Sequence, residues 1–210
     1  MLWRQTFPVG ALQCNCTLLG DTDTREAIVI DPGDEVDRIL SELSRAGMRV
    51  TAIVHTHAHI DHVGATAALA RVTEAPAYLH DEDRFLHDML PVQAQLIGLP
   101  AVEQGRIDRG LPDATSLSFG RFELGVLHTP GHTPGSVCFT VPGQDLCFSG
   151  DTLFAGGIGR TDLWGGDHHA IERSIKGRLY GLNGAVQVIP GHGPNTSIDR
   201  ERRGNPFIRA

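Results

Sequence analysis

The chain has no long hydrophobic run, no long basic run, and no N-terminal segment with a basic start and an apolar core. The first absence excludes a transmembrane helix, and the third argues against a secretory signal peptide. The formal net charge of -7 argues against binding to nucleic acid or to an anionic membrane, because both are negatively charged. We therefore expect a cytoplasmic protein with no nucleic-acid or membrane partner.

Cysteine is scarce, and the chain contains no C-x-x-C pair among its four cysteines. Without an oxidising compartment, we expect reduced thiols packed in or near the core rather than disulfides. The length of 210 residues suits one large domain over residues 1–210, and no low-complexity linker divides it.

The spacing of apolar residues predicts strands alternating with helices. Ala27–Asp31 and Val50–Val54 are typical of buried strands. Between them, apolar residues recur at helical spacing, with Asp34 placed as the N-cap and Gly47 as the C-cap. A strand–helix–strand unit favours parallel pairing of its two strands. Further along, residues 118–128 are predicted to form one strand.

One short segment concentrates the side chains that bind metals. Four histidines and one aspartate fall within residues 55–62, between the predicted strand Val50–Val54 and a predicted helix over residues 64–74. Imidazole and carboxylate groups are typical ligands of zinc, iron and manganese. The segment therefore predicts a metal site at the end of a strand.

The order of these side chains predicts two metal ions rather than one. In an extended segment His57 and His59 point to the same side, because strand side chains alternate. Asp61 and His62 are adjacent, so their side chains diverge unless the chain turns there. We expect one metal at His57 and His59 and a second, a few ångströms away, at Asp61 and His62.

Three later strand ends repeat this pattern, each with glycine beside a single histidine or aspartate. These residues are His132, Asp151 and His192. Glycine permits backbone angles that let a neighbouring side chain project from the end of a strand. The sequence thus offers ligands from four strand ends.

The seven candidate ligands are the number that suits a dinuclear site. We predict His57, His59 and His132 at one ion, Asp61, His62 and His192 at the other, and Asp151 as a bridge. Two divalent ions with these carboxylates and a bridging hydroxide leave a net charge of about +1, which favours an oxyanion formed from a carbonyl. Asp61 and Asp151 are therefore also the predicted catalytic residues. The expected ions are two zincs, with iron or manganese as alternatives.

At this point the chain resembles the metallo-β-lactamase superfamily, whose signature is H-x-H-x-D-H. The matching segments, in order, are Asp31-Pro32-Gly33, His57-Ala58-His59-Ile60-Asp61-His62, Pro130-Gly131-His132-Thr133-Pro134-Gly135, Ser149-Gly150-Asp151 and Pro190-Gly191-His192-Gly193-Pro194. It is most similar to the short, single-domain bacterial hydrolases of the glyoxalase II-like kind. That closer similarity is carried by Asn15-Cys16, Ile158-Gly159-Arg160-Thr161-Asp162, Gly166-Asp167-His168, Glu201 and Asn205-Pro206-Phe207.

The resemblance implies an α/β fold, an αββα sandwich of two mixed β-sheets flanked by helices. It also implies hydrolysis of thioesters such as S-lactoylglutathione by a metal-bridging hydroxide. Classical glyoxalase II has an added C-terminal helical domain that contributes to glutathione binding, and this chain ends soon after the last metal motif. Arg160, near the position of a glutathione-binding lysine in the classical enzyme, is the candidate for binding a substrate carboxylate. Asp31 and His55 are candidates for hydrogen bonding to the metal-binding histidines.

Other functions fit parts of the same pattern. Persulfide dioxygenases share the motifs and hold one iron with residues equivalent to His57, His132 and Asp151 or a close subset. A metallo-hydrolase of another ester or of a lactam, and a non-enzymatic metal-binding module, are further alternatives. Residues 84–99 suit either a lid over the site or ordinary helix packing. The oligomeric state is left open by the sequence.

Overall fold

The computed structural model describes residues 1–209, and the chain divides into two compact units. The N-terminal unit comprises Met1–Leu111 with Ser118–Phe122, and the C-terminal unit comprises Pro112–Leu117 with Glu123–Ala210. Two six-stranded sheets form the frame of these units. The single domain over residues 1–210 stays a prediction.

The first sheet is mixed, with the strand order β1-β2-β3-β4-β5-β6. The two pairs from β1 to β3 are antiparallel, and the three pairs from β3 to β6 are parallel. Its strands are β1 (Leu2–Val9), β2 (Cys14–Asp21), β3 (Glu26–Ile30), β4 (Arg49–Val54), β5 (Ala77–Leu79) and β6 (Arg109–Gly110). The helices of this unit are α1 (Val36–Ala46), α2 (Ile60–Val63), α3 (Thr66–Thr73), α4 (Arg84–Asp88) and α5 (Leu90–Ile97), with a 3-10 turn η1 (Asp81–Asp83).

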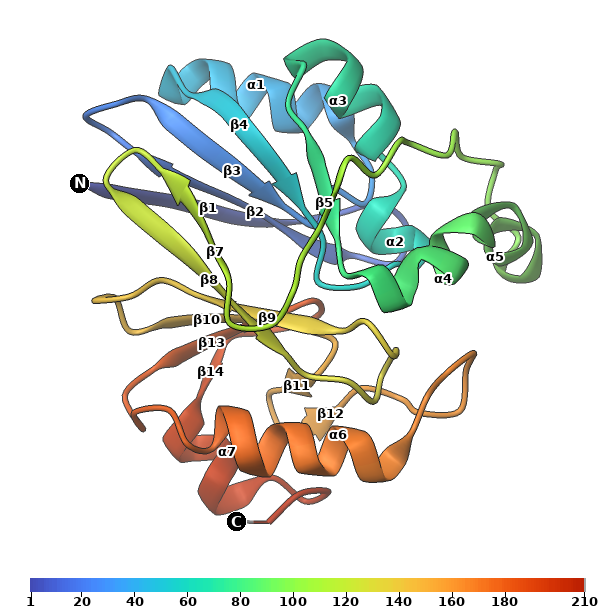
Figure 1. The fold of residues 1–210 in the computed structure, drawn as a ribbon, viewed down its shortest axis with the longest axis vertical. Coiled ribbons are helices and arrows are strands. Elements are labelled where there is room, and N and C mark those ends of the chain that lie inside the picture. The colour runs from blue at the N-terminus through green and yellow to red at the C-terminus, as the bar shows by residue number, and fades with distance from the viewer. Residues whose placement is uncertain (210) are drawn as a thin grey trace. The chain divides into compact units, whose positions relative to one another are not determined.

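Helices α1 and α3 cover one face of this sheet (Figure 1). Ile39 and Leu43 of α1 and Leu69 of α3 are buried in the same apolar cluster as Val29 and Ile53 of the strands. Burying such side chains stabilises the unit by about 1.5–3 kcal/mol each. The apolar residues whose spacing predicted α1 therefore form the face by which this helix packs on the sheet.

The two ends of α1 differ in how well the sequence predicted them. Gly47 is the C-cap, with φ 65, and its N–H bonds the carbonyls of Leu43 and Ser44, as predicted. The predicted N-cap, Asp34, is wrong. Glu35 occupies that position in a left-handed conformation without a side-chain capping bond. Asp34 instead accepts a hydrogen bond from the N–H of Glu35, because a short carboxylate bonds readily to nearby backbone in a turn.

The second sheet is also mixed, with the order β14-β13-β10-β9-β8-β7. β10 and β13 are parallel, whereas β13–β14, β9–β10 and β8–β9 are antiparallel. Its strands are β7 (Ser116–Phe119), β8 (Phe122–His128), β9 (Val137–Thr140), β10 (Leu146–Gly150), β13 (Gln187–Pro190) and β14 (Thr196–Ser197). A separate hairpin pairs β11 (Leu153–Phe154) with β12 (Gly157–Ile158).

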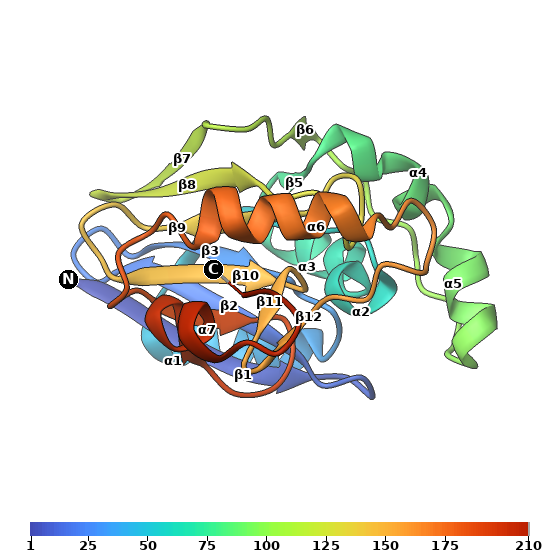
Figure 2. The ribbon, with the colours of Figure 1, turned by 90° about the horizontal axis from the view of Figure 1, so that it is seen from below.

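Helices α6 (His168–Ser174) and α7 (Ile198–Gly204) lie over one face of this second sheet, as Figure 2 shows from below. α6 continues into a π-helical turn, η2 (Ile175–Leu179). Ile171 and Ile175 pack in one buried cluster with Val188 of β13 and Ile198 of α7. This cluster fixes the strands whose ends carry the predicted ligands of the C-terminal unit.

The strand predicted over residues 118–128 is wrong, because two strands occupy that region. β7 ends at Phe119 and β8 begins at Phe122, with Gly120 at φ 59 in the turn between them. That left-handed conformation favours glycine, which allows the chain to reverse. Apolar spacing alone did not distinguish a hairpin from one long strand.

Parallel pairing determines where the loops that carry predicted ligands leave each sheet. Ile30 at the end of β3 pairs with Val54 at the end of β4, which confirms the parallel pairing predicted for this unit. In the C-terminal unit, Gly150 of β10 pairs with Pro190 of β13. Each pair of strands therefore delivers its following loops to a single edge of its own sheet.

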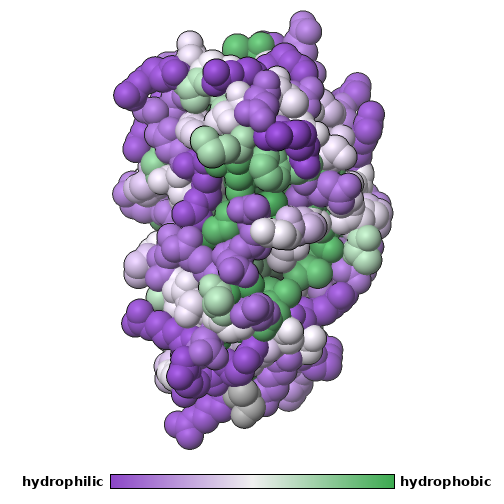
Figure 3. Space-filling view, turned by 90° about the vertical axis from the view of Figure 1, so that its left-hand side faces the viewer, coloured by the Kyte–Doolittle hydropathy of each residue, from purple (hydrophilic) through white to green (hydrophobic). Residues whose placement is uncertain are grey.

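The surface and the thiols agree with the composition. Hydrophilic residues predominate on the face drawn in Figure 3, with apolar residues showing between them. None of the helices in the described residues is long and apolar enough to cross a membrane. All four cysteines are buried and reduced, as predicted, and burial raises the pKa of the Cys14 thiol to about 12.

Candidate metal centre

The histidine segment is a loop that turns into a helix, not an extension of the strand. β4 ends at Val54, and α2 begins at Ile60, so the chain turns before Asp61 and His62. The single helix predicted over residues 64–74 is corrected to α2 followed by α3. The turn places Asp61 Oδ2 3.6 Å from His62 Nε2, although the two residues are adjacent.

Two buried polar side chains hold the backbone of this loop. Asp83 Oδ2 accepts a hydrogen bond from the Ala58 N–H at 3.0 Å, and Gln93 Oε1 accepts one from the Ile60 N–H at 2.9 Å. The Gln93 amide also donates to the Ala58 carbonyl at 3.1 Å and to the Leu86 carbonyl at 2.8 Å. The bonds to Ala58 and Ile60 give buried backbone groups of the loop their partners, and the bond to Leu86 ties the same amide to α4. Sequence reasoning missed both residues, because nothing in their spacing relates them to the loop.

Asp31 organises the start of the same loop. Its carboxylate accepts hydrogen bonds from the Thr56 N–H at 2.7 Å, from the Thr56 hydroxyl at 2.7 Å and from His62 Nδ1 at 3.0 Å. An ionised carboxylate only accepts, so His62 carries its proton on Nδ1 and its lone pair on Nε2. Asp31 has φ 51, a left-handed conformation that aspartate tolerates better than most residues.

The same chain of bonds assigns the tautomer of His57. The Thr56 hydroxyl donates to Asp31, so it is an acceptor for His57 Nδ1, 3.1 Å away. His57 therefore presents its lone pair on Nε2, which lies 3.0 Å from His59 Nδ1. The His57 ligand atom also lies within 4.8 Å of a His62 ligand atom. The N-terminal unit thus brings His57, His59, Asp61 and His62 together.

His55 lies deeper than these residues. Its ring is fully buried, and Nε2 lies 3.1 Å from the Thr66 hydroxyl oxygen of α3. Burial lowers the pKa of His55 to about 4, so the ring is neutral at pH 7. The Thr66 bond links the end of β4 to α3, the helix that covers the sheet.

The C-terminal unit brings together the three remaining predicted ligands. Asp151 Oδ2 lies 3.7 Å from His132 Nε2 and 3.7 Å from His192 Nε2. His132 Nδ1 donates to the Arg160 carbonyl oxygen at 2.8 Å, which leaves the His132 lone pair on Nε2. A backbone carbonyl here has the orienting role that a carboxylate has for His62.

The carbonyl of Arg160 is placed by the β11–β12 hairpin, which joins Asp151 to Gly159. A Cβ on Gly159 would lie 1.9 Å from the Asp151 carbonyl oxygen, so only glycine allows this close approach. At the tip of the hairpin, Glu201 accepts a hydrogen bond from the Gly156 N–H at 2.9 Å, and Asn205 donates to the Gly157 carbonyl at 3.1 Å.

Glu201 is a buried carboxylate with three donors, a feature that sequence reasoning missed. Besides Gly156, it accepts from the Thr196 hydroxyl at 2.5 Å and from the Asn205 amide at 2.9 Å. Only 1% of the residue is exposed, so each of these bonds offsets a large desolvation cost. The motif residues Glu201 and Asn205 therefore attach the C-terminal helix to the hairpin that supports His132.

Arg160 has an exposed side chain that already forms an ion pair. Its guanidinium donates to both carboxylate oxygens of Asp162, at 2.7 and 2.9 Å. This arginine lowers the pKa of Asp162 to about 2. The bidentate geometry is the one that suits recognition of a carboxylate.

The donor set of each unit has the chemistry that a divalent metal needs. In His57, His62 and His132, one ring nitrogen is hydrogen-bonded to an oxygen atom. The other ring nitrogen therefore carries the lone pair that could bind a metal. Orientation of this kind is typical of metal-binding imidazoles. Carboxylate oxygens of Asp61 and Asp151 complete the two groups. The residues therefore fit a metal centre on their own geometry.

Comparison with known proteins gives an independent result. A family model described as the Metallo-beta-lactamase superfamily matches residues 9–192. Hydroxyacylglutathione hydrolase GloC of Haemophilus influenzae is 38% identical over 208 residues, which cover 98% of each chain. The mitochondrial persulfide dioxygenase ETHE1 of Homo sapiens is 31% identical over 99% of this chain and 76% of its own.

Solved structures are similar over nearly the whole length. The crystal structure of BLEG-1 B3 metallo-beta-lactamase has a TM-score of 0.92 and 38% identity, covering 99% of this chain and 100% of the other. TTHA1623, solved in a di-iron-bound form, has a TM-score of 0.87 and 40% identity, covering 96% and 98%. These likenesses confirm the predicted fold class, α/β with two mixed sheets flanked by helices.

Proposed function

Because the chain belongs to the metallo-β-lactamase superfamily, we propose that it is a metal-dependent hydrolase of thioesters such as S-lactoylglutathione. The observation that carries this proposal is the 38% identity to hydroxyacylglutathione hydrolase GloC over 98% of both chains. The superfamily consists generally of hydrolases, and the histidine and aspartate groups of both units support metal binding. The substrate class is the part that needs an assay.

The proposed ligand sets are those predicted from the sequence. His57, His59 and His132 would hold one divalent ion, Asp61, His62 and His192 would hold the second, and Asp151 would serve both. A bound pair of divalent metals supplies an activated water at neutral pH and stabilises negative charge on a carbonyl oxygen. Asp31 and Thr56 keep His57 and His62 in the tautomers that ligation requires.

Asp61 and Asp151 have roles beyond ligation in this proposal. Asp61, whose side chain is 15% exposed, orients the attacking water, and Asp151 limits the net positive charge of the site. A thiolate is a good leaving group, so the reaction needs no separate general acid.

Arg160 is proposed to bind a carboxylate of the thiol carrier. Its exposed pair with Asp162 contributes little to stability, so a substrate carboxylate exchanges with Asp162 at small cost. In the complex with substrate, the Arg160 guanidinium can then bind the substrate carboxylate in the bidentate geometry in which it now binds Asp162.

The proposed metal is zinc, with iron or manganese as the competing ions. Imidazole and carboxylate ligands suit all three, and the similar protein TTHA1623 was solved with two irons. Elemental analysis of protein purified without added metal measures both identity and stoichiometry. Two ions per chain are expected.

The assay of function uses metal-loaded protein and S-lactoylglutathione, with hydrolysis followed by loss of the thioester. His57→Ala is expected to lower kcat/KM by about a hundredfold or more, because a lost ligand costs at least as much as a lost hydrogen-bond partner of a ligand. The exposed His169→Ala variant is the matched control and should retain wild-type activity. No turnover across a panel of thioesters would reject this substrate class.

A second candidate is a persulfide dioxygenase with one iron, which the 31% identity to ETHE1 of Homo sapiens favours. Its ligands would be His57, His132 and Asp151 or a close subset. Oxygen uptake with glutathione persulfide and one iron per chain would support this function over thioester hydrolysis.

A further inference from the structure

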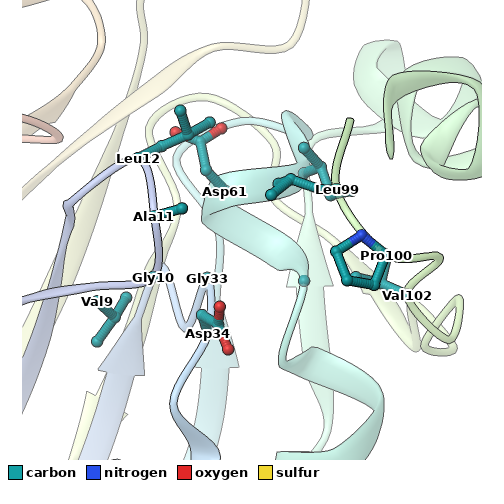
Figure 4. Close-up of a pocket in the computed structure, with 12 residues that line it drawn as sticks. Val9, Gly10, Ala11, Leu12, Gly33, Asp34, Asp61, Leu99, Pro100 and Val102 are labelled. Carbon is teal, nitrogen blue, oxygen red and sulfur yellow. The ribbon is translucent and has the colours of Figure 1, made fainter. Parts of the chain in front are cut away.

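A cavity of about 190 Å³ lies beside Asp61 in the N-terminal unit (Figure 4). One wall comes from the β1–β2 turn and the other from the segment after α5. The apolar side chains that form these walls are Val9, Ala11, Leu12, Leu99, Pro100 and Val102. Figure 4 shows Asp61 beside Leu12 at one end of the cavity and Asp34 at the other end.

The charges around this cavity restrict what it can bind. Asp34 and Asp61 are the charged residues among those that line it, and both are acidic. An anionic group, such as a carboxylate of a thiol carrier, is therefore disfavoured there. An uncharged apolar group fits the walls, because binding removes the 45%-exposed Leu12 and the half-buried Leu99 from water.

We propose that this cavity, the acyl pocket, binds an apolar acyl group of about six carbons in the thioester substrate. The inference rests on the proposed thioester hydrolysis and specifies the acyl half of the substrate. Asp61, assigned above to the reacting centre, also lines the pocket. When the thioester carbonyl lies near Asp61, the acyl chain attached to it can therefore extend between Leu12 and Leu99. A cavity of about 150 Å³ holds benzene, so this volume admits a hexanoyl or phenylacetyl group.

The expected dependence of kcat/KM on the length of the acyl chain follows from the burial of apolar groups. Each methylene that enters the pocket is expected to raise kcat/KM about fourfold, the factor that corresponds to about 0.8 kcal/mol. The increase should stop once the pocket is full, at roughly six to eight carbons. S-Lactoylglutathione, with its short polar acyl group, should then be hydrolysed more slowly than hexanoylglutathione.

The experiment varies the acyl chain on one thiol carrier. Metal-loaded full-length protein is assayed with acetyl-, butanoyl-, hexanoyl- and lactoylglutathione, and kcat/KM is expected to be highest for hexanoyl. In parallel, calorimetry measures the affinity for S-methyl-, S-butyl- and S-hexylglutathione, thioethers that lack the carbonyl group. Affinity should rise with chain length in the same way.

Two variants test the location of the effect. Ala11→Trp fills the pocket from an exposed turn and should lower the hexanoyl-to-acetyl ratio of kcat/KM at least about tenfold. Ala101→Trp makes the same change at an exposed position that does not line the pocket, and this ratio should stay at the wild-type value.

The outcomes separate the two proposals. A flat chain-length series in turnover and in thioether binding, or a ratio that Ala11→Trp does not change, overturns the acyl pocket. Absence of turnover with every thioester rejects the proposed function instead. In that case the thioether affinities still test the acyl pocket. They support it if affinity rises with chain length in the wild type but not in Ala11→Trp, and any other result overturns it.

Discussion

The two units of this protein supply their predicted metal ligands in different ways. In the N-terminal unit, His57, His59, Asp61 and His62 come from one loop and the helix that follows it. In the C-terminal unit, His132, Asp151 and His192 follow the ends of three separate strands, β8, β10 and β13. The first group lies in one short run of the sequence, whereas the members of the second are far apart in the sequence and come together only through the pairing of strands.

The support of the ligands differs in the same way. Side chains hold the N-terminal loop: Asp31 bonds the His62 ring, and Asp83 and Gln93 bond the backbone. In the C-terminal unit, the Arg160 carbonyl bonds His132, and Glu201 acts on that carbonyl only through a hairpin. The comparison teaches that a direct side-chain partner should matter more to metal binding than a remote anchor.

The largest effect is expected at Asp31. Asp31→Ala removes the acceptor for His62 Nδ1 and for both donors of Thr56, so metal affinity should fall by about 10–100-fold. Competition with a metal-binding dye measures the affinity. Asp37→Ala, at an exposed position of α1, is the control and should bind metal like wild type. Equal affinity in Asp31→Ala would show that His62 needs no carboxylate partner.

The remote anchor gives the next effect. Glu201→Leu leaves the buried donors of Thr196 and Asn205, and the Gly156 N–H, without this acceptor, so the free energy of unfolding should fall by about 2–3 kcal/mol. Glu201→Gln keeps an acceptor and should lose less than half as much. Urea unfolding measures both, and metal affinity should fall less than in Asp31→Ala. A larger loss of metal affinity at Glu201 would reverse the comparison between the units.

The loop backbone gives a smaller effect in the N-terminal unit. Gln93→Leu removes the acceptor for the Ile60 N–H and the two amide N–H donors to the Ala58 and Leu86 carbonyls, so stability should fall by about 1–2 kcal/mol. Gln95→Leu, at an exposed position of the same helix, is the matched control with no expected change. Thermal unfolding of the two variants side by side measures the difference, and identical midpoints would contradict it.

The smallest effect is expected at the exposed pair of Arg160 and Asp162. Arg160→Ala should raise KM for glutathione thioesters roughly threefold to tenfold with little change in kcat, because it removes a charge-assisted contact. Asp162→Ala removes the competing carboxylate and should lower KM. Steady-state kinetics at low and high salt measures both changes. An increase of KM in Asp162→Ala would mean that the pair itself positions the arginine.

Much of the fold was predictable from local patterns. Apolar spacing placed α1 and its C-cap at Gly47, and the strand–helix–strand order predicted the parallel pairing of β3 with β4. The errors came from positions where several local conformations suit the same residues. Asp34 has the chemistry of an N-cap but bonds within a turn, and residues 118–128 contain a hairpin that apolar spacing does not reveal.

The family and the candidate ligands were determined by the sequence alone, because metal-binding motifs are short runs of residues whose chemistry is local. The sequence named Asp31 as a candidate partner of the metal-binding histidines, but tertiary structure decided which atoms Asp31 bonds and which other groups orient the ligands. Asp31, Gln93, Glu201 and the Arg160 carbonyl lie far along the chain from the groups they bond, and only the folded backbone brings them within hydrogen-bond distance. The acyl pocket is of the same kind, because its walls come from segments almost ninety residues apart whose apolar side chains meet only after folding.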